Sequence, residues 1–546
     1  MHSGKKGPRG FLLASSFIDE SPVTDFRGIA YIGKSIVIGP QGFSKYKNKH
    51  PLTIDSFNEG RFTLFLKDGD VFWAKCDSSG QDILYYYSDG NNWAVANSFY
   101  LLATHLKEMG VGLTVDEDCI KSFFINHTLG QQLVSHRTMV REIKVVPIDK
   151  AIKVRLRPDD FGKRVDLVQC YDASNKPNID AEAYRECLES YCLKWASRLR
   201  CLIEYYKGME AFDLSGGVDS RLNLSLLTAS GYDVGDLNLC SNINHVRDYE
   251  VAQKVAAAVG GRIQNRKLRS KPMPAKRAYN LWKLGNLGIY APVYGNTRSN
   301  AEAILHVHGA GGGCFRQVYH KTPDELSRLV KKKFKTGGIG SAFANLMRDA
   351  FRDMQHDMSS PDGMLLHYRY FRSRFHFGRN GYRSLSSVLA TPLCSPDLVY
   401  ATRFLTEEER KRNQLALDIM LLTNPRLAYI EFDSENKSFF REAIESSLFY
   451  REKPISPEKL EAYDIYTGIV ATEVQDEQAK NRTFLAHLME DFKRFYVWVL
   501  KANLVDKELI AEAAAELEAS GSLSKRGRGA ARIISTGEVL ALCGQF

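Results

Sequence analysis

Short hydrophobic runs alternate with clusters of turn-forming residues through the first third of the chain. Asp68-Gly69-Asp70 and Ser78-Ser79-Gly80 are two such clusters, and they separate runs rich in aromatic and β-branched residues. This pattern predicts strands over residues 61–67, 71–76, 83–88, 93–96, 143–146 and 151–154. Helices are expected over residues 98–109 and 115–127, so the region favours a layered α/β or α+β arrangement.

A segment near the N-terminus matches the phosphate-binding pattern GxxxxGK[ST] from Gly28 to Ser35. The four residues between its glycines are Ile-Ala-Tyr-Ile, which is a strand composition, and Ile36-Val37-Ile38 follow. That pattern needs a flexible loop and a helix at these places. We therefore predict a β-hairpin that turns at Gly33-Lys34.

From residue 181 onward the pattern changes to strands that alternate with helices. A helix is predicted over 181–206, with Leu188, Cys192, Trp195 and Leu199 on its apolar face. Strands are predicted over 211–214, 236–241, 262–268 and 303–308, and helices over 218–229, 248–259 and 274–284. Residues 157–178 are polar and predict a linker. The alternation predicts a parallel sheet with helices on both faces and ligands outside the carboxyl ends of its strands.

The strongest chemical signal lies between the first of these strands and the helix after it. There the chain reads Leu214, Ser215, Gly216, Gly217, Val218, Asp219, Ser220. A glycine turn at a helix start presents backbone N–H groups to a polyphosphate, and the serines add hydroxyl donors. Asp219 supplies a carboxylate suited to Mg²⁺. The hexamer predicts a binding loop for ATP and pyrophosphate.

This hexamer resembles the SGGxDS loop of ATP pyrophosphatases. With residues 77–86, 93–98 and 146–150, it makes the chain similar to the asparagine synthetase family over about residues 60–455. The resemblance implies an α/β fold: a glutaminase-like (Ntn-type) layered sandwich domain at 1–160, then a Rossmann-like parallel-sheet ATP-pyrophosphatase domain at 180–500. A helical C-terminal extension is expected at 501–546.

The family's glutaminase nucleophile is a cysteine at the mature N-terminus. This chain begins Met1-His2, and its first cysteine is Cys76, inside a predicted strand. The resemblance therefore implies an amino-terminal domain without glutaminase activity, as in the β-lactam synthetases and lasso-peptide cyclases. The nitrogen would come from free ammonia or from an amine.

A second glycine-rich loop runs from His308 to Phe315 and matches the place of the family's Gly-Glu-Gly-x-Asp-Glu loop. Gly309 and Gly311 are retained, and the resemblance implies that they approach the nucleotide, as does Ser241 at the end of the second strand. Its acids are replaced by Ala310, Gly313 and Cys314. Asp219 would then hold Mg²⁺ alone, and a degenerate, inactive site is the competing interpretation.

Two acidic or basic positions are open to two interpretations each. Asp248 either caps the helix that it begins or belongs to the family's acidic segment. The run 436–453 resembles a family segment whose last lysine reaches pyrophosphate, so Lys453 is a candidate catalytic residue; the alternative is a surface lysine.

Charge pattern indicates three further features. Thr322-Pro323-Asp324-Glu325 predicts a capped helix start, and the lysines from 331 to 333 fit the end of that helix. We expect a helix over 507–519 and a basic exposed loop over 525–529.

Composition narrows the classes of protein to which the chain can belong. The chain has 546 residues, a net charge of +10, ten cysteines without a CxxC pair, and no apolar stretch long enough for a membrane span. These features favour a cytoplasmic protein with anionic ligands and no membrane partner, and nucleic acid is not expected.

The resemblance implies an ATP-dependent ligase that activates a substrate carboxylate as an acyl-adenylate and couples it to an amine or ammonia. Two alternatives stay open: a catalytically degenerate nucleotide-binding protein of the same family, and a tRNA-modifying ATP pyrophosphatase. The carboxylate, the nitrogen donor and the oligomeric state stay undetermined.

Overall fold

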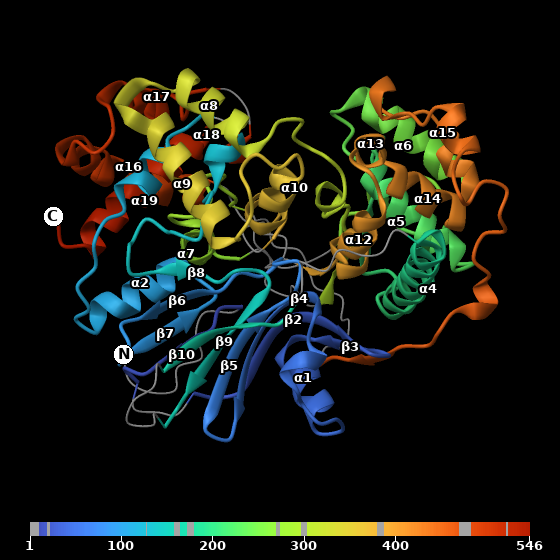
Figure 1. Ribbon diagram of the computed structural model, residues 1–546, viewed down its shortest axis with the longest axis horizontal. Helices are drawn as coiled ribbons and strands as arrows, with labels where there is room; N and C mark the ends of the chain where they lie inside the picture. Colours follow the sequence, from blue (N-terminus) through green and yellow to red (C-terminus); the bar gives the residue numbers. More distant parts are fainter. Residues whose placement is uncertain are drawn as a thin grey trace.

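The computed structural model describes residues 10–18, 22–126, 128–157, 164–171, 180–268, 273–295, 303–378, 387–468, 482–519 and 522–545. It is a mixed α/β structure with three sheets, two of them antiparallel in the main and one parallel. Figure 1 shows the sheets of the N-terminal third at the base and two groups of helices above them.

The largest sheet is built almost entirely from the N-terminal third. Its spatial order is β10-β9-β5-β4-β2-β3-β15, and only β15 runs parallel to its neighbour. The strands are β2 (Asp25–Ile32), β3 (Ser35–Ile38), β4 (Glu59–Asp68), β5 (Val71–Cys76), β9 (Lys150–Arg155), β10 (Val165–Gln169) and β15 (Asp464–Tyr466).

A second, four-stranded antiparallel sheet has the order β1-β7-β6-β8. It contains β1 (Leu13–Ser15), β6 (Tyr85–Ser88), β7 (Trp93–Ala96) and β8 (Lys144–Val145). Phe65 and Phe72 of the large sheet pack with Trp93 and Val95 of the small one in a shared core. The large sheet packs its other face on α1 (Gly39–Lys47), and the small sheet on α2 (Phe99–Glu108) and α3 (Glu117–Phe123). The region is therefore layered, as its pattern predicts.

The GxxxxGK[ST] match is a hairpin. β2 and β3 pair antiparallel from Ile29 with Ile38 to Ile32 with Ser35. Gly33 at the turn has φ 54°, a left-handed conformation that glycine adopts without a Cβ penalty. The prediction of a hairpin is confirmed.

The third sheet is wholly parallel, with the order β12-β11-β13-β14. Its strands are β11 (Glu210–Asp213), β12 (Leu239–Cys240), β13 (Leu305–Val307) and β14 (Val388–Ala390). It shares one core with α4 (Ala181–Tyr205), α5 (Val218–Ala229), α6 (Val246–Ala258), α12 (Pro396–Ala401) and α14 (Gln414–Thr423). All four apolar positions predicted for α4 are fully buried. The parallel sheet is confirmed.

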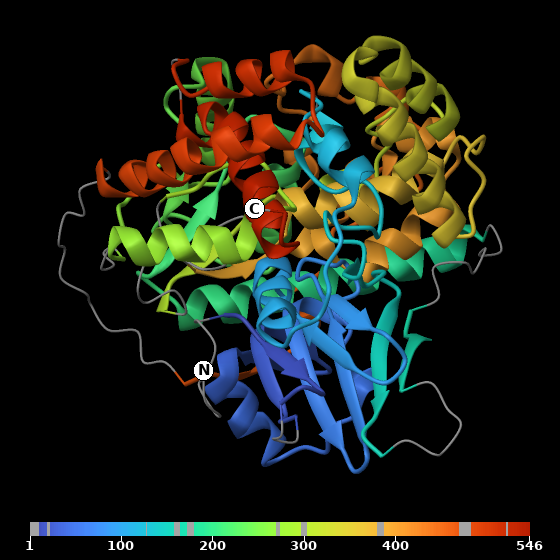
Figure 2. The same ribbon diagram turned by 90° about the vertical axis from the view of Figure 1, so that its left-hand side faces the viewer.

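The remaining helices belong to the two groups above the N-terminal sheets, on both sides of Figure 1. They are α7 (Ala275–Asn286), α8 (Pro323–Lys333), α9 (Ile339–Asp353), α10 (Gly363–His367), α11 (Ser373–Phe377), α13 (Glu407–Lys411), α15 (Arg441–Glu445), α16 (Arg482–Ala502), α17 (Lys507–Ala515), α18 (Leu523–Arg526) and α19 (Arg528–Leu542). A π-helical segment, Tyr368–Arg372, joins α10 to α11. The side of α2 and α3 that faces away from the small sheet shares a core with α7, α9, α16 and α19. Both views place α19 against α2 (Figures 1 and 2).

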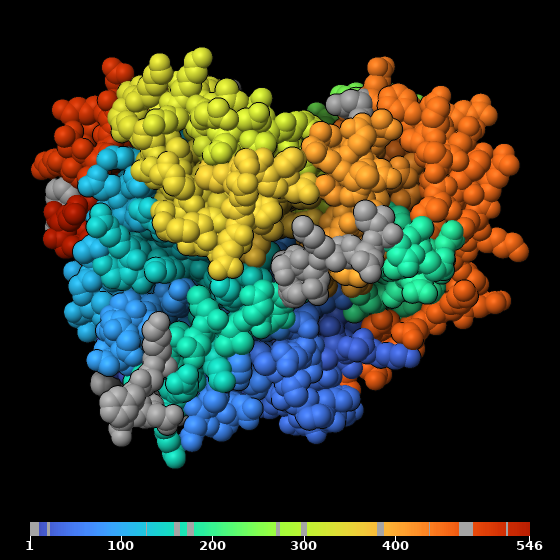
Figure 3. Space-filling view, in the orientation of Figure 1, coloured from blue at the N-terminus to red at the C-terminus, as the bar shows by residue number. Residues whose placement is uncertain are grey.

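The surface follows the same arrangement. Figure 3 shows the N-terminal third at the base, with the segment around residues 320–370 above it on one side and the segment around residues 400–450 on the other. Within the described ranges, no helix is both long and apolar enough to cross a membrane.

Three predicted elements differ from the structure. Residues 262–268 form one isolated bridge, Leu239 with Ile263, because Asn265 takes a left-handed φ of 49° that interrupts an extended strand. The predicted linker contains β10, a half-exposed edge strand whose polar residues hide its pattern. The predicted basic loop at 525–529 is helical, and Gly527 and Gly529 are buried.

Helix ends also shift. The helix predicted over 115–127 is α3, which ends at Phe123, and residue 127 lies outside the described residues. The helix predicted to 519 ends at Ala515. His245 is the N-cap of α6, so Asp248 is a first-turn residue and not a cap. The capping box of Thr322 and Glu325 at α8 is confirmed, with the three lysines in the last turn.

Candidate nucleotide-binding site

The Ser215–Ser220 loop joins β11 to α5 at the carboxyl edge of the parallel sheet. β11 ends at Asp213, Gly217 is the N-cap of α5, and Val218 is its first residue. The N–H groups of a helix's first turn have no intrahelical partner and lie at the positive end of its dipole. The predicted strand, turn and helix are confirmed, and the loop lies where a parallel sheet binds ligands.

The loop is held in shape by its own serines. Ser220 Oγ accepts a hydrogen bond from the Ser215 N–H at 2.9 Å and lies 3.0 Å from Ser215 Oγ. Ser215 Oγ in turn accepts from the Gly217 N–H at 3.2 Å. These bonds use the amides of residues 215 and 217, so the N–H groups from Val218 to Ser220 are the ones left for an anion.

A neighbouring acid and a distant segment hold the middle of the loop. The Gly216 N–H donates to Asp248 Oδ1 at 2.9 Å, and the Gly216 carbonyl accepts from the Asp433 N–H at 3.1 Å. A Cβ on Gly216 would lie 2.9 Å from the Asp433 Cβ, so the approach requires glycine. Lys437 Nζ donates to both oxygens of Asp433 at 2.8 Å. The segment 433–437 therefore brings a lysine to the loop.

The two glycine loops meet in the structure. A Cβ on Gly309 would lie 3.1 Å from the Ser220 nitrogen, and one on Gly312 would lie 2.2 Å from Asp219 Oδ1. Gly311 has φ 110°, and its Cβ position is 2.5 Å from the Leu393 carbonyl carbon. Glycine is therefore required for the second loop to lie against the first turn of α5.

No acidic side chain replaces the ones missing from the second loop. Ala310 is 1% exposed, and its carbonyl accepts from the Cys394 thiol at 3.4 Å. The Tyr368 hydroxyl fills the space beside Gly313, where a Cβ would lie 2.3 Å from its oxygen. Cys314 donates to Ser373 Oγ at 3.1 Å, and burial raises the pKa of its thiol. These three positions are packed.

Asp219 is paired with an arginine from the segment after that loop. Arg316 Nη1 lies 3.0 Å from Asp219 Oδ1, and Nη2 donates to Oδ2 at 3.1 Å. Burial raises the pKa of Asp219, while the charges of Arg316 and Lys437 oppose that rise. Arg316 therefore lies within ion-pair distance of both oxygens and donates a hydrogen bond to Oδ2, while Oδ1 has no hydrogen-bond partner among the described residues.

The donor set at Asp219 does not fit Mg²⁺, which prefers several oxygen ligands in octahedral geometry. Its two oxygens contact a guanidinium, and the neighbouring loop contributes no carboxylate. Nowhere in the described ranges do three His, Cys, Asp or Glu side chains form a group that could hold a metal ion. The Mg²⁺ expected from the resemblance has no site here unless Arg316 moves.

Two imidazoles share a carboxylate at the same sheet edge. His306 Nε2 lies 2.7 Å from Asp213 Oδ1, and His308 Nε2 lies 3.5 Å from Oδ2. The register of β11 with β13 places Asp213 next after the pair Phe212 and Val307. Groups able to exchange protons therefore lie where both glycine loops begin.

Two further predicted site residues, Ser241 and Lys453, lie outside the contact between the two glycine loops. Ser241 directly follows β12, and its hydroxyl is buried without a hydrogen-bond partner among the described residues. Lys453 is exposed; its neighbour Glu452 pairs with Arg185 of α4, and the Ile455 N–H donates to the Leu422 carbonyl in α14. These contacts tie the Lys453 segment to α4 and α14, and its contact with pyrophosphate stays a prediction.

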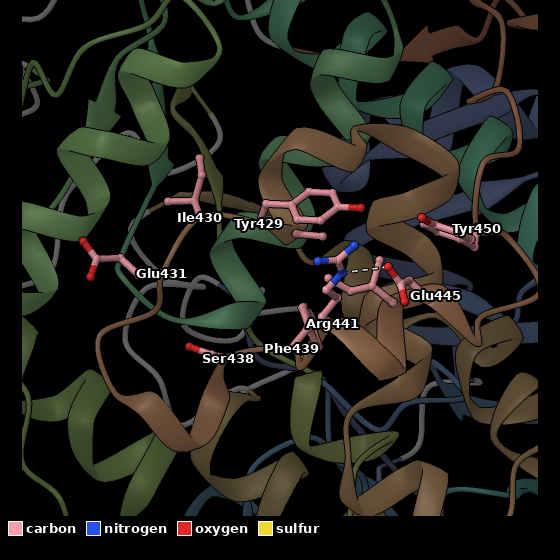
Figure 4. A pocket seen from close by; sticks show the side chains of 10 residues that line it. Tyr429, Ile430, Glu431, Ser438, Phe439, Arg441, Glu445 and Tyr450 are labelled. Carbon is pink, nitrogen blue, oxygen red and sulfur yellow. Dashed lines mark hydrogen bonds and ion pairs between the residues drawn. The ribbon is translucent and has the colours of Figure 1, made fainter.

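A hollow of about 430 Å³ is lined by residues 428–431 and by residues between 438 and 450 (Figure 4). Tyr429 and Arg441 face each other across it, with Tyr450 at one side. Arg441 pairs with Glu445 at 2.7 Å. Arg221 of α5 donates to the carbonyls of residues 427, 430 and 431, so the wall of this hollow is fixed to the helix that follows the Ser215–Ser220 loop.

In comparisons with known proteins, no family model matches the chain and no curated protein matches it significantly. The assignment of a function therefore depends on the geometry of the two loops.

Sequence reasoning missed Arg316, Asp433 and the role of Lys437. The resemblance covers Lys437, but its last lysine was the one given a role. Arg316 directly follows the glycine-rich loop of residues 308–315, and a lone arginine there carries no local signal. Asp248 had two interpretations, and its hydrogen bond to Gly216 favours contact with the loop.

Proposed function

We propose that the chain is an ATP-dependent, AMP-forming carbon–nitrogen ligase similar to asparagine synthetases. The observation that carries the proposal is the contact between two glycine loops at the carboxyl edge of a parallel sheet, Gly309 against Ser220 and Gly312 against Asp219. Such a contact brings the second loop beside the first turn of α5, whose free N–H groups can bind an anion. The layered sheets at the N-terminus and the parallel sheet support an Ntn-type domain followed by a Rossmann-like ATP-pyrophosphatase domain.

The reaction proceeds in two steps. A carboxylate oxygen of the substrate attacks the α-phosphorus of ATP, the bond to the β-phosphate oxygen breaks, and pyrophosphate leaves. The nitrogen of an amine or ammonia then attacks the acyl carbon, AMP leaves, and the nitrogen loses a proton. The N–H groups of residues 218–220 and the Ser215 hydroxyl are in place to stabilise the negative charge of the departing pyrophosphate.

The first cysteine supports a chain without glutaminase activity. Cys76 lies in β5 and is 3% exposed, and burial raises the pKa of its thiol to about 12. The nucleophile of a thiol enzyme is the thiolate, which this site disfavours. Met1-His2 lies outside the described residues. In this proposal the nitrogen comes from ammonia or from a substrate amine.

One second candidate has observations in its favour. The packed positions Ala310 and Gly313 and the pairing of Asp219 with Arg316 suit a nucleotide-binding protein that has lost catalysis. That candidate shares the ATP site and differs in releasing no pyrophosphate.

The test is pyrophosphate release from ATP in the presence of pooled carboxylates and amines, including peptides and sugar acids. We expect release that depends on one carboxylate and falls at least tenfold in Ser215→Ala, which loses the hydroxyl that holds Gly217. Ser230→Ala is the matched control, because its hydroxyl bonds the Leu227 carbonyl at the opposite end of α5. ATP binding without release from any pool would support the degenerate protein instead, and no ATP binding would reject both.

A further inference from the structure

The pairing of Asp219 with Arg316 separates this site from the metal-dependent one that the resemblance implies. A guanidinium that contacts both oxygens of a carboxylate is a stable, directional arrangement. The side chains of Asp219 and Arg316 are 26% and 30% exposed, so the pair reaches the surface at the edge where both loops end. A cation is therefore already present where a phosphate-bridging metal would be expected.

The glycine loop makes this pair possible. Gly312 has no Cβ, and any side chain there would overlap the Asp219 carboxylate. The Tyr368 hydroxyl occupies the space that a side chain at position 313 would need, so this position cannot offer a second carboxylate. Neither glycine offers a metal ligand, and Gly312 leaves room for the Asp219 carboxylate that pairs with Arg316.

Arg316 has donors to spare. A guanidinium has five N–H groups, and the contacts with Asp219 use one or two of them. Lys437 adds a second cation, close enough to oppose the raised pKa of Asp219. One turn beyond Asp219 on α5, Asn223 is fully buried, donates to the His308 carbonyl at 3.0 Å, and keeps Oδ1 without a partner among the described residues. A polar group is therefore still lacking at the contact of α5 with the second loop.

We propose that Arg316 supplies the positive charge that Mg²⁺ supplies in the SGGxDS loop, so that this chain binds the phosphates of ATP without a divalent cation. The inference rests on the proposed function, since it concerns the same ATP site. Asp219 then pairs with the guanidinium and is not a metal ligand. Arg316 is a binding residue that decides the metal requirement of the site.

The test is calorimetric titration of the full chain with ATP, once with excess EDTA and once with Mg²⁺. We expect dissociation constants that agree within threefold. In EDTA, Arg316→Gln raises the constant at least tenfold, and Arg316→Lys, which keeps the charge and loses the two-pronged geometry, gives a smaller increase. Arg352→Gln is the control, because Arg352 is 72% exposed and pairs with Asp349 in α9.

Asp219→Asn is an independent variant, and its expected effect on ATP affinity in EDTA differs in direction from that of Arg316→Gln. Removing the carboxylate charge frees Arg316, so affinity in EDTA stays the same or increases, whereas loss of a metal ligand would abolish binding in Mg²⁺. Circular dichroism verifies that each variant is folded.

Three results would overturn the inference: binding that needs Mg²⁺, unchanged affinity in Arg316→Gln, or loss of binding in Asp219→Asn. The first leaves the proposed ligase intact. Metal-free ATP binding without pyrophosphate release would support the inference and contradict the proposed ligase. Failure of the inference and failure of the proposed function are therefore distinguishable.

Discussion

Single residues at the candidate site are determined by close backbone contacts. Gly216, Gly309 and Gly312 each face an atom within about 3 Å of the place a Cβ would take. A Cβ at Gly312 would force the Asp219 carboxylate or the loop to move, and one at Gly309 would press on the first turn of α5, so glycine lets the two loops lie this close together. The site is therefore defined by missing side chains as much as by Asp219 and Arg316.

Gly312→Ala tests this directly. The new methyl carbon would lie 2.2 Å from Asp219 Oδ1 and 2.4 Å from its Cγ, so the carboxylate or the loop must move. We expect ATP affinity to fall at least tenfold and the free energy of unfolding to fall by about 1 to 3 kcal/mol. Titration with ATP and urea denaturation measure the two effects.

Gly285→Ala is the control for that substitution. Gly285 lies inside α7, and no atom lies within 4 Å of its Cβ position. Alanine in a helix interior is favoured over glycine by about 0.5 to 1 kcal/mol, so this variant gains stability and keeps ATP affinity. Equal affinity in both variants would contradict the contact between Gly312 and Asp219.

The residues also show what a sequence can predict. Ser215 to Ser220 are consecutive in the chain, and Thr322 and Glu325 of the helix cap are three positions apart. A local pattern therefore suffices to predict both features. Arg316 meets Asp219 across 97 positions, and that meeting depends on the path of the whole chain between them. Asp248 stabilises a helix start and also binds Gly216, and the sequence alone does not separate these roles.

Elements of the fold are joined by a buried ion pair between α4 and the large sheet. Glu59 of β4 accepts hydrogen bonds from Arg198 at 2.6 Å and from Trp195 Nε1 at 3.1 Å, both in α4, and from Ser395 at 2.6 Å. Burial alone would raise its pKa, but Arg198 and Lys194 hold the pKa at about 2. This cluster fixes the parallel sheet's longest helix to the N-terminal sheet.

Glu59→Gln removes one charge from this cluster and leaves Arg198 buried beside a neutral amide. We expect the free energy of unfolding at pH 7 to fall by about 3 to 5 kcal/mol, the usual cost of an unpaired buried charge. The pKa of Glu59 lies below the ordinary glutamate value of 4.5, so its stabilisation is present above pH 4.5 and is lost as pH falls toward 2. The variant lacks that part of the acid sensitivity.

Urea denaturation across this pH range measures the effect of Glu59→Gln. Glu204→Gln is the matched control, since Glu204 pairs with Arg200 on the exposed side of the same helix and is 52% exposed. Such surface pairs contribute less than about 1 kcal/mol. Similar losses in the two variants would show that the cluster does not hold α4 to the sheet.

Element prediction failed where the pattern was weak. β10 was hidden because all its residues are at least partly exposed and none marks a buried face. β1 is three residues long, too short for any periodicity. By contrast, the second strand of the parallel sheet was predicted from hydrophobic residues within 236–241, and Leu239 is fully buried in β12.

At the scale of the whole molecule, the C-terminal helices complete the core of the N-terminal region. α19 packs against α16, α17 and α2, and a Cβ on its Gly529 would lie 1.6 Å from the Ala513 carbonyl oxygen in α17. Arg532, 1% exposed, pairs with Glu516 and donates to the Ile125 carbonyl at 3.4 Å, just after α3. The last helix thus connects parts of the chain some 400 residues apart.

A chain that ends at Ala519 lacks α18 and α19 and tests this dependence. Loss of α19 would expose the apolar surface that this helix covers on α2, α7 and α16. This surface includes Phe495, whose ring packs on Gly537. At about 25 cal/mol per Å² of apolar surface, uncovering a few hundred Å² costs an amount on the order of the 5 to 15 kcal/mol that stabilises a typical domain. We therefore expect no cooperative thermal transition and rapid proteolysis near α2 as well as near the new end.

A chain that ends at Cys543 removes only the last three residues and should keep the full chain's Tm. If the Ala519 chain instead unfolds cooperatively and resists cleavage at α2, the C-terminal helices are a separate unit, and the N-terminal sheets have a core of their own.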